Sequence, residues 1–213
     1  FVPKLERTDR LYAPRDGDEL YEWLVERALV TRDEWQRILH AGEELDERAI
    51  VDRVIVLRGE IGARRFESVL ALELVPRMLA LMPEARELEP GGLVEGEPLS
   101  QATRAALDDA LSRREQSGFA SQDDLASWIG DWLAFRGPVP VDQVRASLPA
   151  GLERIDRAVA ELVEANGAVL DRVTEGATSP ELCSVENLAR LLRSQRAAAR
   201  RAVGRSTAAT AAI

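Results

Sequence analysis

The chain has 213 residues, 46% of them apolar, and a formal net charge of −9, so it can bury one or two globular cores. Its single cysteine, Cys183, excludes an internal disulfide and any zinc site built from cysteines. No apolar run reaches the roughly 18 residues of a membrane span, and no signal peptide is visible, so we expect a cytoplasmic protein with no membrane contact.

The first residues with clear periodicity predict two helices. Residues 18–28 place Leu20 and Trp23 on one face of a helix, at a spacing near 3.6 residues per turn. Thr31 and Glu34 then form a capping box, in which each side chain satisfies a backbone N–H of the other residue. We therefore expect a second helix to begin at this box.

A hairpin and a third helix follow. Residues 53–58 are short and β-branched, and residues 65–72 alternate in side-chain character, with the turn sequence GEIG between them. Residues 73–82 predict a helix in which Pro76 is tolerated because it lies in the first turn. The Pro-, Gly- and Glu-rich residues 82–98 are interpreted as a linker.

The second half of the chain predicts three helices, a two-stranded wing and a last helix. Asn166 followed by Gly167 favours a left-handed turn between the third of these helices and the wing. A polar helix over 100–116 precedes this group. The expected elements are helices over 121–135 and 141–148, a helix from Leu152 through Leu162, a wing over 168–184 and a helix from residue 184 or 185 onward.

This order predicts a mainly α fold with small β-hairpin wings, arranged as tandem winged-helix (helix-turn-helix) domains. A weak internal repeat agrees with two related units, because VLALELVPRML (69–79) aligns with LCSVENLARLL (182–192) and both have a strand followed by a helix. The expected parts are a winged-helix-like unit over 1–96 with its hairpin at 53–72, a winged-helix unit over 97–201 with its wing at 168–184, and a disordered tail over 202–213.

Charged side chains on the two last helices are the candidates for contact with other molecules. The helix from Leu152 onward has a net charge of −2, so it predicts a solvated face and not a base-reading helix, although Arg154 and Arg157 lie on it. Arginines of the last helix recur every three or four residues and share one face, which fits either a nucleic-acid backbone or an acidic protein neighbour. Two arginines beside the hairpin turn are weaker candidates for the same kind of contact. The full candidate set is Arg64, Arg65, Arg154, Arg157, Arg190, Arg193, Arg196 and Arg200.

Other residue types with chemical potential are assigned to packing or left without a role. The four tryptophans lie at core-facing helical positions, which predicts packing and not base stacking. The lone His40 has no placed partner, and the acids near the hairpin have no assignable acid–base role. These residues are Trp23, Trp35, Trp128 and Trp132, together with Glu60, Glu67 and Glu73. We predict no catalytic residue, no metal site and no cofactor in this chain.

Three segments carry a resemblance to a known family. ELCSVENLARLLRSQRAAAR (181–200) resembles a C-terminal signature of the large helicase-related (Lhr) family of ATP-dependent DNA helicases. RVIVLRGEIGARRFESVLALELVPRMLALMPEA (53–85) and FRGPVPVDQVRASL (135–148) are similar to two further segments of that family. Leu182 departs from the signature, which has tryptophan there, and the P-loop pattern GxxxxGK[ST] does not occur in the chain.

The resemblance implies an accessory role beside a helicase motor. Lhr proteins are ATP-driven helicases that translocate on single-stranded DNA in DNA repair, with winged helices behind the motor. Because the chain begins at Phe1, we expect it to be part of a longer polypeptide whose motor domains use ATP and Mg²⁺. The expected function is non-catalytic: assembly of a homo-oligomer, docking to the motor domains, and contact with single-stranded or double-stranded DNA.

Two other classes of function remain open at this point. One is a free-standing acidic tandem winged-helix protein that docks on a chromosome-organising ATPase. The other is a winged-helix DNA glycosylase, which requires a carboxylate facing a pocket the size of a base.

Overall fold

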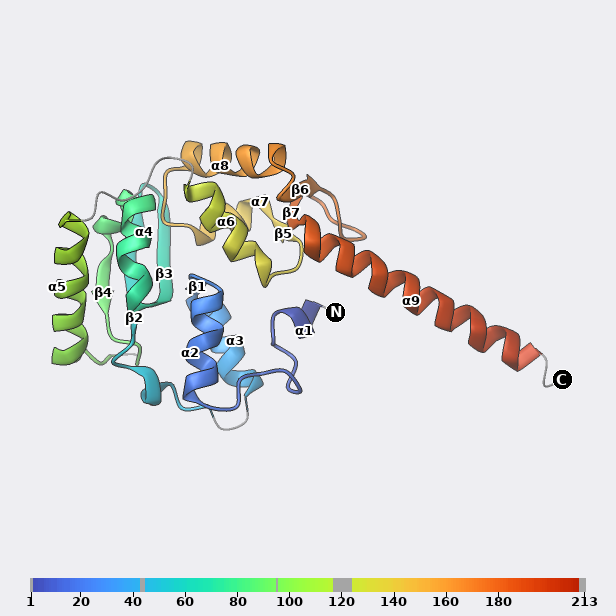
Figure 1. The fold of residues 1–213 in the computed structure, drawn as a ribbon, viewed down its shortest axis with the longest axis horizontal. Helices are drawn as coiled ribbons and strands as arrows, with labels where there is room; N and C mark the ends of the chain where they lie inside the picture. The colour runs from blue at the N-terminus through green and yellow to red at the C-terminus, as the bar shows by residue number, and fades with distance from the viewer. Residues whose placement is uncertain (1, 43–44, 95, 117–123, 211–213) are drawn as a thin grey trace.

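The protein combines helices with two small antiparallel sheets (Figure 1). The computed structural model describes residues 2–42, 45–94, 96–116 and 124–210. The first sheet has the strand order β1-β3-β2-β4, and the second has the order β5-β7-β6. In both sheets, the third strand in the sequence lies between the first two. Each sheet thus joins a short strand to a hairpin in the same way.

The first unit begins with a short helix and then alternates helices and strands. The Thr31–Glu34 capping box is confirmed, since Thr31 Oγ1 accepts from the Glu34 N–H and Glu34 accepts from the Thr31 N–H. The elements are α1 (Val2–Leu5), α2 (Gly17–Glu26), β1 (Val30–Thr31), α3 (Arg32–Ala41), the 3-10 turn η1 (Glu47–Ile50), β2 (Val54–Ile61), β3 (Arg64–Ala71), the 3-10 turn η2 (Leu72–Leu74), α4 (Val75–Leu81), the 3-10 turn η3 (Pro83–Glu87) and β4 (Glu89–Gly91).

The predicted hairpin is confirmed, but its turn is shorter than expected, because Gly59, Glu60 and Ile61 of the GEIG segment extend β2; both faces of the hairpin are buried. β2 and β3 pair from Val54↔Ala71 to Ile61↔Arg64, and Gly62 adopts φ +60° in the two-residue turn, a conformation that glycine accepts without steric cost. One face packs under α2 and α3, while the other meets α4 and the second unit. This double burial explains why apolar residues follow one another in the strands instead of alternating with polar ones.

The segment interpreted as a linker is instead part of the first unit, which corrects the interpretation of residues 82–98. Residues 89–91 form β4, which pairs with β2, and Leu88 and Leu93 are buried beside it. Pro90 is tolerated because β4 lies at the edge of the sheet and needs no second hydrogen-bonding partner. A Pro- and Gly-rich stretch is therefore compatible with a short edge strand here.

The polar helix α5 (Gln101–Gln116) packs on the first unit, against α4 and η2. Ser100 begins it as predicted, since its Oγ accepts from the Thr103 N–H at 3.0 Å, and Ser100 also donates to Asp52. Figure 1 shows α5 beside α4, at the far side from α9. The sequence prediction placed the boundary between the units at residue 97, which assigns α5 to the second unit. In the structure α5 packs against the first unit instead.

The second unit has the helices and the two wing strands expected from its sequence, and a further short strand, β5, that was not expected. Asn166 adopts φ +55°, which confirms the left-handed turn before the wing, and β6 pairs with β7 from Ala168↔Ser184 to Asp171↔Glu181. Residues 121–123 of the expected first helix lie outside the described residues. The elements are α6 (Asp124–Ala134), β5 (Val139–Pro140), α7 (Val141–Ser147), α8 (Leu152–Glu164), β6 (Ala168–Asp171), β7 (Glu181–Ser184) and α9 (Val185–Thr210).

One apolar cluster runs through both units. Ile55 and Leu70 of the first sheet belong to the same buried cluster as Trp128 and Trp132 of α6. Trp23 and Trp35 lie in a second cluster, on the other face of the first sheet. All four tryptophans are at most 2% exposed, so their predicted packing role is confirmed. The two units therefore share one core, and the first unit has a second core of its own.

The last helix is longer than expected and leads away from the body (Figure 1). α9 continues to Thr210, so residues 202–210 form the end of a helix where the sequence predicted a tail without structure. Ala202, Ala208 and Ala209 favour this continuation, whereas Gly204 and the threonines do not, so the stretch extends a helix already formed by the residues before it. Residues 211–213 lie outside the described part of the chain.

The junction between the units and the candidate contact surfaces

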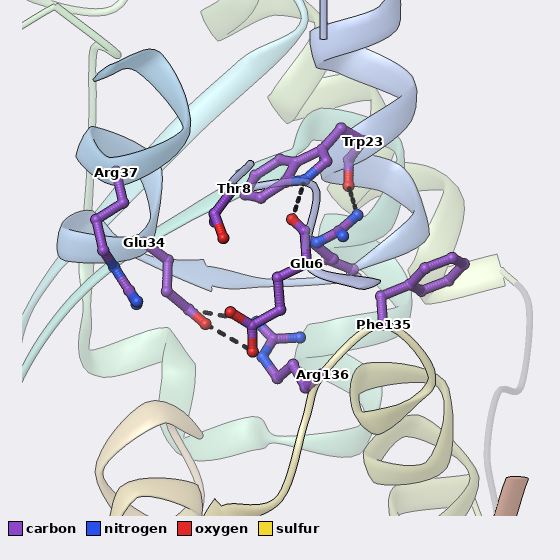
Figure 2. A pocket seen from close by; sticks show the side chains of 8 residues that line it. Glu6, Thr8, Trp23, Glu34, Arg37, Phe135 and Arg136 are labelled. Carbon is purple, nitrogen blue, oxygen red and sulfur yellow. Dashed lines mark hydrogen bonds and ion pairs between the residues drawn. The ribbon is translucent and has the colours of Figure 1, made fainter. Parts of the chain in front are cut away.

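A small pocket marks the junction between the units (Figure 2). The N-terminal segment, α2, α3 and the residues after α6 all contribute side chains to it. Its two innermost cations, Arg27 and Arg136, are 2% and 4% exposed. The pocket has room for about 20 Å³ and is lined by Glu6, Thr8, Trp23, Arg27, Glu34, Arg37, Phe135 and Arg136.

Arg136 of the second unit reaches into the first unit and is fully engaged there. Its guanidinium donates to both carboxylate oxygens of Glu34, at 3.1 and 3.3 Å. It also donates to the carbonyl of Leu29 at 3.1 Å, which accepts a second hydrogen bond from Trp132 Nε1 at 3.1 Å. The same capping-box glutamate that starts α3 therefore fixes the second unit in place.

Arg27 is buried on the other side of the same junction. It donates to the carbonyls of Trp23 and Leu5, and its guanidinium lies 4.4 Å from the centre of the Trp23 ring. Burial and the nearby charge of Arg136 lower the pKa of Arg27 to about 9, so its side chain is still charged at neutral pH. Burial alone would raise the pKa of Glu34, but Arg136 and the Thr31 N–H outweigh it, and the net shift is downward.

The size and charge of the pocket define what it can hold. A space of about 20 Å³ is enough for a water molecule and too small for a phosphate group or a base. Its three arginines face Glu6 and Glu34 in the pocket, with Glu26 within 3.6 Å of Arg27. We interpret this pocket as the fastening point of the two units.

A second polar seam joins the units on the side of the hairpin tip. Arg64, at the start of β3, donates to the carbonyls of Arg145, Leu148 and Ala150 in the second unit. Arg154 donates to Glu84 at 2.8 Å and to the carbonyl of Leu81. These two arginines, expected as contacts for nucleic acid or a partner, are therefore used inside the chain.

Glu84 completes this seam from the first unit. Its Oε1 accepts from the Gly151 N–H at 3.0 Å, at the N-terminus of α8. Burial raises the pKa of Glu84, but backbone hydrogen bonds and the charge of Arg154 outweigh it, so the net pKa is below its usual value. The sequence contained no local signal for this role, because Glu84 and Arg154 are 70 residues apart.

The outer side of α8 is exposed and acidic. Glu153, Glu161 and Glu164 lie on it, and no described residue forms an ion pair with them; we call these three residues the acidic face. Asp156, by contrast, is paired with Arg145 at 2.9 Å. Arg157 is the exposed cation on this side of the helix. Three carboxylates against one arginine oppose approach to phosphate, in line with the sequence prediction.

The first turns of α9 are fastened to the body by one buried amide. Asn187, 1% exposed, donates from Nδ2 to the carbonyls of Leu133, Ala134 and Arg136, which end α6. Its backbone N–H is capped by Ser184 Oγ at 3.2 Å. The sequence did not single out this residue, since its partners come from a helix about 50 residues earlier.

The arginines of α9 fall into two groups. Arg190 pairs with Glu186, one turn before it on the helix, at 2.5 Å. Arg193, Arg196 and Arg200 are exposed, and within the described part of the chain no acidic side chain pairs with them; we call these three the arginine stripe. They have the spacing of three and four residues that the sequence predicted to share a face.

Arg65 lies apart from the arginine stripe, in open hollows beside the first sheet. One hollow of about 540 Å³ brings it together with Arg58, Glu60 and Glu67, and Arg58 pairs with Glu67 at 3.0 Å. Glu73 is not among the residues lining this hollow.

His40 and Cys183 lie away from these surfaces. His40 is exposed at the end of α3, and burial raises the pKa of the Cys183 thiol to about 11.

The described residues show neither a metal-binding cluster nor a membrane-spanning helix. They contain no group of three or more His, Cys, Asp or Glu side chains placed to hold a metal ion. None of their helices is both long and apolar enough to cross a bilayer.

The protein was compared with protein-family models, curated proteins and solved structures. No family model, curated protein or solved structure matches this chain.

Proposed function

We propose that this chain is an accessory assembly module, built from tandem winged helices, of an ATP-dependent DNA helicase of the Lhr type that acts in DNA repair. The matching strand orders of the two sheets support the tandem arrangement, with η1 standing where the second unit has the helix α8. The three segments that resemble the Lhr family support the assignment to such a helicase. Its ATP, Mg²⁺ and motor domains belong to the rest of that polypeptide.

The observation that carries the assembly role is the projecting helix α9. The rest of the chain is joined into one body through a shared core and two polar seams. α9 leads away from this body with its arginine stripe unpaired. A rigid body with one basic arm is suited to fasten on a larger assembly, in which the arm supplies the contact.

DNA contact by the same arm is the second candidate function. The arginine stripe is the observation that favours it, because phosphate contacts are made by arginines in such rows. The acidic face of α8 restricts this contact to the arm, since carboxylates repel the phosphate backbone. Binding would therefore be independent of sequence and strongly weakened by salt.

The variant R193E/R196E tests both functions, which are separated by the two measurements below, and R86E/R172E is its control, because it changes the net charge equally at exposed sites outside α9. We expect the native chain and the control to associate with themselves or with the motor domains, and R193E/R196E to lose that association, as measured by light scattering and sedimentation. Anisotropy titrations with single- and double-stranded DNA between about 50 and 200 mM salt measure the second function. A native chain that neither associates nor binds DNA would contradict the proposal.

A further inference from the structure

α9 exposes an apolar ridge in addition to its arginine stripe. Val185 and Leu192 are 41% and 42% exposed, although both are large apolar side chains at the base of the helix. Leu188 lies between them, and the spacing of three and four residues places all three on one face. The ridge and the arginine stripe lie on neighbouring parts of the helix surface. A partner of α9 must therefore offer both apolar area and carboxylates.

The distribution of net charge along the sequence makes a second copy of this chain a suitable partner for α9. Residues 186–205 contain six arginines and one acid, which gives them a net charge of +5. Because the whole chain has a net charge of −9, the remaining residues have a net charge of −14. The basic charge is thus concentrated in the one helix that stands clear of an acidic body. Two copies of this chain attract each other where α9 of one meets an acidic surface of the other.

The outer side of α8 provides that surface. It has the unpaired acidic face, and Leu152, about 100° around the helix from Glu153, is 46% exposed and adds apolar area at the edge of that face. Glu153 and Glu164 are separated along the helix by about 16 Å, and Arg193 and Arg200 by about 10 Å, at 1.5 Å per residue. The arginine stripe therefore fits within the length of the acidic face.

Within one molecule the two helices do not meet in this way. Among the described residues, no ion pair joins the arginine stripe to the acidic face, and α9 leads away from the body that bears α8 (Figure 1). The contact therefore requires a second molecule. A two-fold axis allows both copies to make it at once, because each then offers α9 to the α8 of the other.

We infer that α9 docks on the acidic face of α8 in a second copy of this chain, giving a reciprocal dimer. This inference rests on the proposed assembly function and names its partner surface. The apolar ridge and Leu152 supply the desolvated part of the contact, and the arginine stripe and the acidic face fix its register. Because the charges are exposed, association weakens as salt rises.

Two charge-reversal variants test the inference by complementation. R193E/R196E places acidic side chains in the arginine stripe of α9, and E161R/E164R places basic side chains in the acidic face of α8. In a dimer of either variant alone, side chains of like charge therefore meet in both reciprocal contacts and repel each other. Each is expected to raise the Kd of self-association at least about tenfold. An equal mixture is expected to form a one-to-one heterodimer, because both contacts in that pair again join opposite charges. R86E/R172E and E22R/E175R are the charge-matched controls.

Sedimentation velocity of the intact chain, the four variants and the mixture gives the readout, with circular dichroism to show that each is folded. Single glutamine changes at the same exposed positions replace any variant that fails to fold. A native chain that is monomeric but associates with the motor domains overturns the inference alone, and one that associates with neither overturns the assembly role as well. If R193E/R196E abolishes association while E161R/E164R leaves it intact, α9 docks elsewhere and only the inference fails. If only DNA binding responds, the nucleic acid is the partner and the inference is overturned.

Discussion

At the scale of single residues, the junction depends on a buried ion pair between Glu34 and Arg136. Glu34 also caps α3, so one carboxylate accepts from a backbone N–H of its own unit and from an arginine of the other. Removing one member of such a pair is costly, because the remaining charge stays buried without its partner. The pair therefore links the start of a helix to the docking of a unit.

Acid should remove the contribution of this pair. The folded-state pKa of Glu34 is lowered, so its stabilising effect is complete above the unfolded value of about 4.3 and is lost as the pH falls through the folded value. We expect Glu34→Gln to unfold about 1–3 kcal/mol more easily at neutral pH, and this difference to shrink below about pH 4. Urea titrations across the pH range measure it.

Glu186→Gln is the matched control for this prediction. It breaks the exposed ion pair with Arg190, in which the Glu186 side chain is 72% exposed, and we expect a change of less than about 0.5 kcal/mol at any pH. A Glu34→Gln variant with equal stability differences at neutral and acid pH would contradict the assigned role of the carboxylate.

At the scale of elements, Asn187 decides how α9 leaves the body. Its amide satisfies carbonyls at the end of α6, where a helix leaves its last C=O groups without intrahelical partners. The link is between the first turn of one helix and the last turn of another. α9 is thereby fixed in direction at its base, while its later turns have no described contact with the sheets.

We predict that Asn187→Ala destabilises the second unit by about 1–3 kcal/mol, the cost of leaving buried carbonyls unpaired. Amide hydrogen exchange should become faster at the base of α9 and at the end of α6. Asn187→Asp serves as a second test, since a carboxylate among carbonyl oxygens cannot donate. Unchanged exchange in both variants would show that the apolar contacts of α9 alone hold its base.

The sequence predicted those elements whose signals are local. The capping box at Thr31 and the left-handed Asn166 were visible as short patterns, and so was the hairpin, although its turn was expected over GEIG (59–62) and lies after Ile61. β4 was missed because a three-residue edge strand rich in proline and glycine has no signal until its partner β2 is known. Arg136 and Glu84 were missed for the same reason, since their partners are 102 and 70 residues away. Composition concealed the last turns of α9, which looked like a low-complexity tail.

At the scale of the whole molecule, the two units share one apolar cluster and cannot be separated without exposing it. The sheet of the first unit buries Ile55 and Leu70 against the helix α6, which bears two of the four tryptophans. Arg77 extends the link, with an ion pair to Asp131 at 3.2 Å. Burial of this kind makes unfolding cooperative across both units.

We therefore expect a single unfolding transition. Trp23 and Trp35 lie in the first unit and Trp128 and Trp132 in the second, so the double variants W23F/W35F and W128F/W132F each keep the tryptophans of one unit only, and their fluorescence follows each unit separately. Their denaturation midpoints should agree with each other and with far-ultraviolet circular dichroism, apart from any equal shift from the substitutions. Two separate midpoints would show that the units unfold independently and that the seams are weak.

The position of Asn187 gives the arm a mechanical route into the body. The amide holds the main-chain carbonyl of Arg136, and the side chain of that same arginine is anchored in the opposite unit. The carbonyls of Leu133 and Ala134, bound by the same amide, share this link between α9 and the body. A partner that pulls on α9 would therefore act on the residue that also joins the two units through Glu34 and the carbonyl of Leu29.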